Sequence, residues 1–131
     1  MDISIIREFI IRDFLPRDMD KVWHFCPNRM LWEAIRAEDA AIVSHADILT
    51  LVRRTSEVYL LPEPLPAFRQ NHEVPYTRVS SRVFMDDFSE YAKTEPLYVF
   101  PNDFSWMIVF TTENTPTGEQ LCIEVKNRQL K

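Results

Sequence analysis

The sequence predicts an α+β fold in a single domain, residues 1–131, in which N-terminal helices precede a small, mainly antiparallel sheet of about four strands with one further helix. Three observations predict this class. Apolar residues recur at helical spacing through much of the first half. Short β-branched and aromatic segments dominate the second half. The connections between those segments are rich in Pro, Asn and Asp, which favour tight turns.

The first half of the chain is predicted to be largely helical. Residues 3–15 and 29–37 each carry one apolar face between charged positions. The cluster at 18–26 fits a helix and a strand equally well. Ser44 is placed to cap a third helix over 45–54, because a serine hydroxyl can accept a hydrogen bond from the first turn.

The middle of the chain changes character. Residues 57–61 are β-branched and aromatic and predict a strand. Prolines punctuate residues 62–78, which predict a long loop. A helix that begins at Ser80 or Ser81 is then predicted to end at Lys93.

Three strands are predicted to close the chain as an antiparallel meander, over residues 97–100, 105–112 and 120–126. The second of these strands is apolar on both faces, so we expect it to be central and covered on both sides. The third alternates apolar and polar residues, so we expect it at a sheet edge. The predicted core of the sheet consists of Val58, Val99, Trp106, Ile108 and Phe110.

Composition excludes several classes of function. The chain is 46% hydrophobic and 27% charged, the balance of a folded globular protein. Its single glycine, Gly118, cannot build the glycine-rich loops that hold nucleotide phosphates or a hydrolase nucleophile, which excludes the commonest nucleotide-binding and hydrolase motifs. A formal net charge of −5 argues against binding to nucleic acid or to an anionic membrane.

The cysteines and the N-terminus predict a cytoplasmic location. Only Cys26 and Cys122 occur, far apart and in apolar settings, so we interpret both as reduced, buried thiols. The N-terminal stretch mixes acidic residues with apolar ones and does not resemble a signal peptide. The longest unbroken apolar runs are four residues long, too short to span a membrane.

The histidines and cysteines do not form a recognisable site for a metal or a nucleophile. His24 and Cys26 lie two residues apart, but no second Cys/His pair completes a zinc site, so we predict no metal. Cys122 lies two residues before Glu124, and an anionic neighbour disfavours the thiolate that a nucleophile needs. We therefore predict no catalytic residue.

Acidic residues are the candidate binding residues. One cluster accompanies the terminal meander and its turns: Asp103, Glu113, Glu119 and Glu124. A competing cluster lies on the last predicted helix: Asp86, Asp87 and Glu90. Each cluster is either a solvated face or a surface that docks a basic protein, since complementary charge steers association.

Residues 97–113 carry a resemblance. The segment reads L-Y-V, then a turn with D-F-S-W, then a strand that ends in T-x-E. It is similar to several small uncharacterised bacterial families, some of whose members look like immunity proteins that neutralise a toxin made by the same cell. This resemblance covers about twenty residues, and it implies protein binding without catalysis and without a cofactor.

Together these observations predict a bacterial, cytoplasmic, non-catalytic protein that binds another protein. In the leading hypothesis it is an immunity or antitoxin-like inhibitor that docks a basic partner through an acidic surface. Two alternatives stay open: a small enzyme with an unrecognised carboxylate or Cys/His site, and a structural or assembly subunit. Association into homo-oligomers also stays open.

Overall fold

A single antiparallel sheet organises the described part of the chain. The computed structural model describes residues 14, 35, 39–62, 76–93 and 96–127. Within these ranges six strands occur: β1 (Ala40–Val43), β2 (Glu57–Pro62), β3 (Thr77–Ser80), β4 (Leu97–Pro101), β5 (Trp106–Asn114) and β6 (Gln120–Lys126). They lie in the order β1–β6–β5–β4–β2–β3, and every neighbouring pair is antiparallel.

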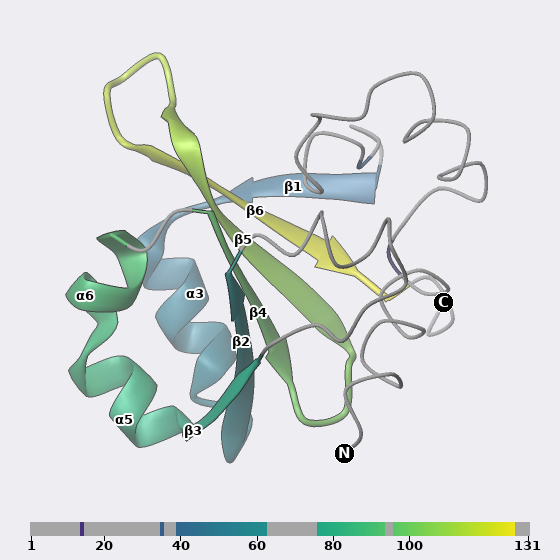
Figure 1. The fold of residues 1–131 in the computed structure, drawn as a ribbon. Coiled ribbons are helices and arrows are strands. Elements are labelled where there is room, and N and C mark those ends of the chain that lie inside the picture. Colours follow the sequence, from purple (N-terminus) through teal and green to yellow (C-terminus); the bar gives the residue numbers. More distant parts are fainter. Residues whose placement is uncertain (1–13, 15–34, 36–38, 63–75, 94–95, 128–131) are drawn as a thin grey trace.

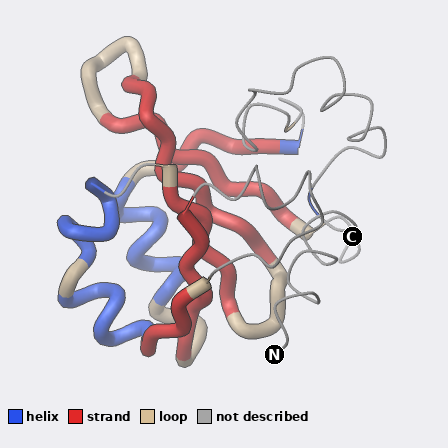
Figure 2. Tube along the Cα trace, viewed as in Figure 1, coloured by secondary structure: helices blue, strands red, loops and turns tan. Residues whose placement is uncertain are grey.

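Three short helices have their full extent within the described residues: α3 (His45–Val52), α5 (Ser81–Asp86) and α6 (Phe88–Lys93). They lie together on one face of the sheet (Figure 1). Figure 2 shows the helices as one layer beside the layer of strands. The β5–β6 hairpin projects beyond both layers, together with the adjoining end of β6 (Figure 1).

The predicted fold class is wrong. The described part of the chain is a sheet-rich fold with six antiparallel strands and three short helices, not N-terminal helices followed by a sheet of about four strands. The sequence does not predict β1 or β3, because each is only four residues long and so shows too little alternation. Apart from Phe14 and Ile35, the predicted helices at 3–15 and 29–37 lie outside the described residues, as does the cluster at 18–26.

Helix α3 forms close to its predicted position. The Ser44 hydroxyl accepts a hydrogen bond from the Asp47 N–H, and the Asp47 carboxylate accepts one from the Ser44 N–H, which together form a capping box. Ile48 and Val52 are buried against the sheet. The helix ends at Val52, two residues before the predicted end.

The predicted helix after Ser80 is divided in two. Ser80 caps α5 by accepting a hydrogen bond from the Val83 N–H, and the chain then leaves helical geometry at Asp87 before α6 begins. The bend lets aromatic rings from both helices pack together. The Phe84 ring stacks on Tyr91 with centroids 5.1 Å apart and meets Phe88 edge-on at 5.7 Å.

The core between the helices and the sheet confirms the predicted positions. Val58, Val99, Trp106, Ile108 and Phe110 are all buried, with Trp106 the most exposed of them at 7%. They pack in one cluster with the buried faces of α3, α5 and α6. Period-two patterning therefore identified the inner face of the central strands.

The opposite face of the sheet is also buried. Met107 and Val109 alternate with the helix-side residues of β5 and are fully buried, which confirms that β5 is covered on both sides. Aromatic rings run across this face, with Phe100 in contact with Phe14 at 5.6 Å and with Phe104 at 5.7 Å. Phe14 therefore packs on this face and is itself buried.

Strand β6 is not the predicted edge. It lies between β5 and β1, because β1 pairs with its outer side. In this antiparallel pair Ala40 lies opposite Val125 and Val43 lies opposite Cys122. Cys122 is fully buried in the helix-side core. Glu124 and Lys126 give β6 its polar appearance, but they lie where the helix layer leaves the sheet partly uncovered.

Candidate functional site

Two regions of the described surface are hollowed. Hollows of about 530 and 450 Å³ adjoin, since Arg54 and Trp106 line both, and they lie between α3 and the β4–β5 turn. We call this pair the Trp106 hollow. A separate hollow of about 580 Å³, which we call the Ile42 hollow, lies where the end of β1, the start of α3 and the β5–β6 hairpin meet. Both are within the size range of ligand sites.

Charges of both signs line the Trp106 hollow. Asp47 and Glu124 face it together with Arg54 and Lys126. Hydrogen bonds from the Ser44 backbone N–H and then from the Ser44 hydroxyl lower the pKa of the Asp47 carboxyl. A carboxyl with a lowered pKa stays ionised, whereas a general acid needs a raised pKa. Asp47 thus serves the capping box of α3 and is not suited to act as a general acid.

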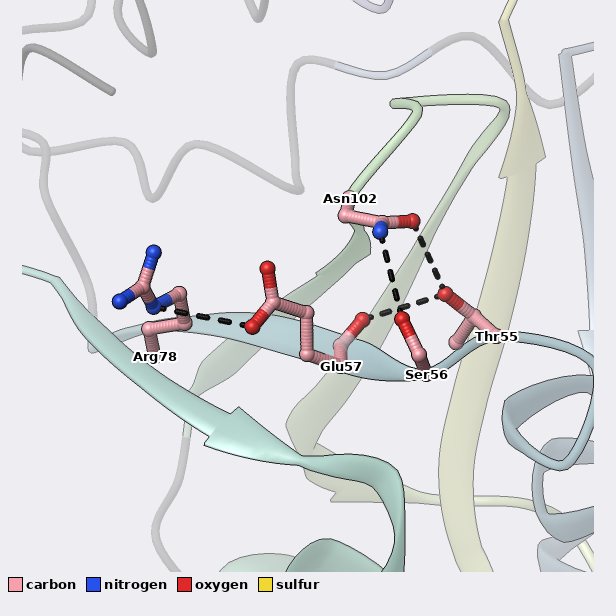
Figure 3. Close-up of polar contacts among 5 residues, drawn as sticks. All are labelled: Thr55, Ser56, Glu57, Arg78 and Asn102. Carbon is pink, nitrogen blue, oxygen red and sulfur yellow. Dashed lines mark hydrogen bonds and ion pairs between the residues drawn. The ribbon is translucent and has the colours of Figure 1, made fainter.

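Polar side chains near the Trp106 hollow bond to one another (Figure 3), and Thr55, Ser56 and Asn102 among them line it. Thr55 Oγ1 lies 3.1 Å from Asn102 Oδ1 and 3.2 Å from the Glu57 carbonyl oxygen. The Asn102 amide donates to Ser56 Oγ at 3.4 Å, and Arg78 Nε lies 3.7 Å from a Glu57 carboxylate oxygen. The contacts of Asn102 join the α3–β2 connection to the β4–β5 turn, and the ion pair of Arg78 with Glu57 joins β3 to β2, so their first role is structural.

The Ile42 hollow combines an apolar and an acidic group. Ile42 is 70% exposed, and it is one of two large hydrophobic side chains exposed in the described part of the chain. Glu119 lines the same hollow from the β5–β6 hairpin, together with Thr115. The Thr115 N–H donates to the Glu119 carbonyl at 2.7 Å, so the hairpin backbone is held at this point.

One glutamine fixes the back of the Ile42 hollow. Gln120 Nε2 donates to the carbonyls of Ala92 at 2.8 Å and Thr111 at 3.3 Å. Its amide oxygen must therefore face His45, whose Nε2 lies 3.0 Å away and donates the proton. The His45 ring also meets Phe88 edge-on at 5.1 Å. Helix α3, helix α6 and the hairpin are thereby tied together beside the hollow.

The structure divides the predicted meander cluster. Asp103 precedes β5, while Glu113 lies near its other end, so the two are separated by the length of the strand. Asp103 and Glu124 line the two parts of the Trp106 hollow. Glu113 and Glu119 are exposed on the β5–β6 hairpin. The four residues therefore form two pairs in different places.

The predicted helical cluster keeps its place on the surface. Asp86, Asp87 and Glu90 are all exposed at the junction of α5 and α6. The Glu90 carboxylate lies 3.9 Å from Lys93 Nζ. Val83, on α5, is the second exposed large hydrophobic residue of the described chain, at 44%. The α5–α6 face thus carries exposed acidic residues and an exposed apolar side chain, and it can be compared with the β5–β6 hairpin and Ile42 on those terms.

Comparison with family models, with curated proteins and with solved structures gave no match. The resemblance of residues 97–113 to immunity-like families therefore stays a hypothesis.

Sequence reasoning missed Ile42 and the strand that carries it. Residues 40–43 read Ala-Ala-Ile-Val, an apolar run immediately before the helix cap at Ser44. The β-branched residues at the end of this run were the available signal for a strand. A run of four residues does not show that the strand lies at the border of the sheet. Ile42 is exposed on β1, the strand that lies outside β6 in the strand order.

The described residues contain no group of three or more His, Cys, Asp or Glu side chains that could hold a metal ion. His24 and Cys26, the pair considered for zinc, lie outside the described residues. Across the same described ranges, no helix is long and apolar enough to cross a membrane.

Proposed function

We propose that this protein is a non-catalytic, cytoplasmic binding protein that docks a basic partner protein at the Ile42 hollow and the adjoining β5–β6 hairpin. The observation that carries the proposal is the placement of the exposed Ile42 beside Glu119 in one hollow. The segment at 97–113 that resembles immunity proteins suggests the kind of partner, a toxin-like basic protein.

An apolar group beside fixed charge is the arrangement that protein interfaces use. An apolar side chain at the centre of an interface gains free energy when the partner excludes water from it. Glu113 and Glu119 supply negative charge at the rim, where complementary charge accelerates association and excludes wrong partners. The hydrogen bond between Thr115 and Glu119 holds the hairpin backbone, which limits the entropy lost on binding.

The other acidic sites fit a basic partner less well. Arg54 and Lys126 line the Trp106 hollow beside Asp47 and Glu124, so positive charge would meet positive charge there. On the helical face, Lys93 lies beside Glu90 and offsets part of its charge. The hairpin pair lacks such a cation among the residues that line the Ile42 hollow.

The test begins with a photo-cross-linking amino acid in place of Ile42 and, as the matched control, in place of Val83. Both positions are exposed and apolar, but they lie in different regions of the surface. In cells of the source organism, we expect position 42 to capture a basic protein that position 83 does not capture. Capture from position 83 alone, or from neither position, would overturn the proposal.

The captured partner is then purified and titrated. We expect the double reversal Glu113→Lys with Glu119→Lys to weaken binding by roughly tenfold or more, because charges at an interface contribute strongly once water is excluded. Asp86→Lys with Asp87→Lys makes the same change in net charge on the helical face and should leave affinity within about twofold. Higher salt should weaken binding to the unmodified protein. Equal effects of the two reversals would contradict the hairpin as the site.

A further inference from the structure

We infer that β1 binds an extended segment of the basic partner as an added strand, through main-chain hydrogen bonds along its outer side. This inference rests on the proposed function and names its mode of recognition. The added segment has an apolar centre with Lys or Arg at its ends. It would form a seventh strand beside the six that the described residues contain.

Strand β1 is an edge without the usual protection. In the described sheet it pairs only with β6, so every second residue directs its N–H and C=O away from the sheet. Ala41 and Ile42 are exposed, and none of its four residues is charged. Edge strands in soluble proteins are commonly blunted by charged side chains, because a bare edge pairs with other chains.

The other edge of the described sheet shows that protection. Strand β3 carries Arg78, whose Nε lies 3.7 Å from a carboxylate oxygen of Glu57 on the neighbouring strand β2. The charged Arg78 side chain is exposed along this edge. A strand added beside β3 would have to displace or bury that charge, which costs free energy. The contrast makes β1 the edge that is suited to pairing.

Charge around β1 selects the occupant. Asp39 precedes the strand and is exposed, and Glu119 lies by its other end in the Ile42 hollow. An apolar strand with acidic groups at both ends is complementary to an apolar segment with basic ends. The Ile42 hollow would receive an apolar side chain of the added segment next to Ile42 itself.

A second copy of the chain fits the same edge poorly. Antiparallel pairing of β1 with β1 of another copy would place Asp39 of each copy beside the Glu119 end of the other. Like charges would then meet at both ends of the new pair, which is unfavourable. The net charge of −5 on each chain adds to this repulsion. The occupant is therefore a basic segment of a different protein.

The test uses short random peptides displayed on phage and selected on the full chain. Ile42→Lys places a charge on the edge, and Val83→Lys makes the same change at the exposed position on α5. We expect selection to enrich peptides with basic residues at both ends and alternating apolar residues between them. The Val83→Lys variant should bind these peptides as the unmodified chain does, whereas Ile42→Lys should weaken their binding at least tenfold. Failure to enrich such peptides, or equal binding to both variants, would overturn strand addition.

Main-chain pairing is then measured directly on the enriched peptide. N-methylation of alternate residues removes their N–H groups, so one alternating set should weaken binding at least tenfold while the other set has little effect. Hydrogen exchange at the outward-facing amides of β1 should slow at least tenfold in the complex. Indifference to both methylated sets, with unchanged exchange, would overturn the inference.

The two proposals fail in distinguishable ways. If Glu113→Lys with Glu119→Lys abolishes binding of the captured partner but peptide N-methylation has no effect, docking at the hairpin stands and strand addition fails. If the chain alone dimerises in sedimentation and Ile42→Lys abolishes the dimer, the occupant of β1 is a second copy and the inference is overturned.

Discussion

At the scale of single residues, Asn127 joins the end of β6 to the β4–β5 turn. Its amide donates to the Phe104 carbonyl at 2.8 Å, and its N–H donates to the Ser105 carbonyl at 3.1 Å. Phe104 has a φ of 56°, an uncommon conformation for a residue other than glycine. Its buried ring, stacked on Tyr59 with centroids 5.7 Å apart, offsets that cost.

Asn127→Ala should therefore destabilise the protein by about 1–3 kcal/mol, because the buried Phe104 carbonyl loses its side-chain donor. Asn114→Ala, at an exposed position on the hairpin, is the matched control and should change stability by less than about 0.5 kcal/mol. Urea unfolding of both variants measures this difference. Equal midpoints for the two variants would contradict the role of Asn127.

Trp106 gives a second prediction at this scale. Its indole is 7% exposed and packs in the cluster between sheet and helices. Trp106→Ala should cost about 3–5 kcal/mol, from lost apolar burial and the cavity left behind. Trp106→Phe keeps much of the packing and should cost clearly less. Near wild-type stability of the alanine variant in denaturant unfolding would show that the assigned core is wrong.

At the scale of elements, the capping box of α3 makes stability depend on pH. The pKa of Asp47 is lowered in the folded protein by the hydrogen bonds from Ser44, so the folded state binds a proton less readily than the unfolded state. The contribution of Asp47 is therefore complete above the unfolded pKa and is lost as the pH falls below about 4.

Ser44→Ala should lower stability by about 1 kcal/mol at neutral pH, since the Asp47 N–H loses its acceptor. Asp47→Asn should remove the loss of stability that protonation of Asp47 causes in acid. Ser89→Ala, at an exposed position on α6, is the control for replacing a serine. Thermal unfolding between pH 3 and pH 7 tests these effects. An acid profile of Asp47→Asn identical to that of the unmodified protein would exclude this contribution.

The strands show how far local pattern could predict the fold. Strands β2, β4, β5 and β6 lie close to their predicted positions, because each has enough residues for its burial pattern to be recognised. β1 and β3 have four residues each, and only their pairing with β6 and β2 makes them strands. Strand order, and with it the exposed position of Ile42, depends on contacts between distant segments that no local pattern contains.

At the scale of the whole molecule, the acidic residues illustrate the same limit. Sequence proximity grouped Asp103 with Glu113, yet β5 places them at opposite ends of a strand. Glu113 and Glu119 do belong together, because the β5–β6 hairpin returns the chain to the same end of the sheet. The sequence could therefore nominate charged residues, but the pairs that they form depend on the topology.

Removal of metal ions should leave the melting temperature unchanged. The described residues contain no group of side chains suited to a metal ion, and the sequence contains no second Cys/His pair to complete a site with His24 and Cys26. Dialysis against a strong chelator, followed by thermal unfolding with and without added zinc, checks this. A fall of many degrees that zinc reverses would reveal a structural metal.

The pairing of β1 with β6 also determines when the edge becomes available. Ala40 meets Val125 and Val43 meets Cys122, so the two strands come from distant parts of the sequence. Closing so long a loop costs more entropy than closing a short one, so this pairing is slow to form. During synthesis on the ribosome, β1 must wait until β6 has emerged. Under the proposed docking, the surface around Ile42 forms only when β6 is present, so a nascent or shortened chain that ends before β6 should not capture the proposed partner there.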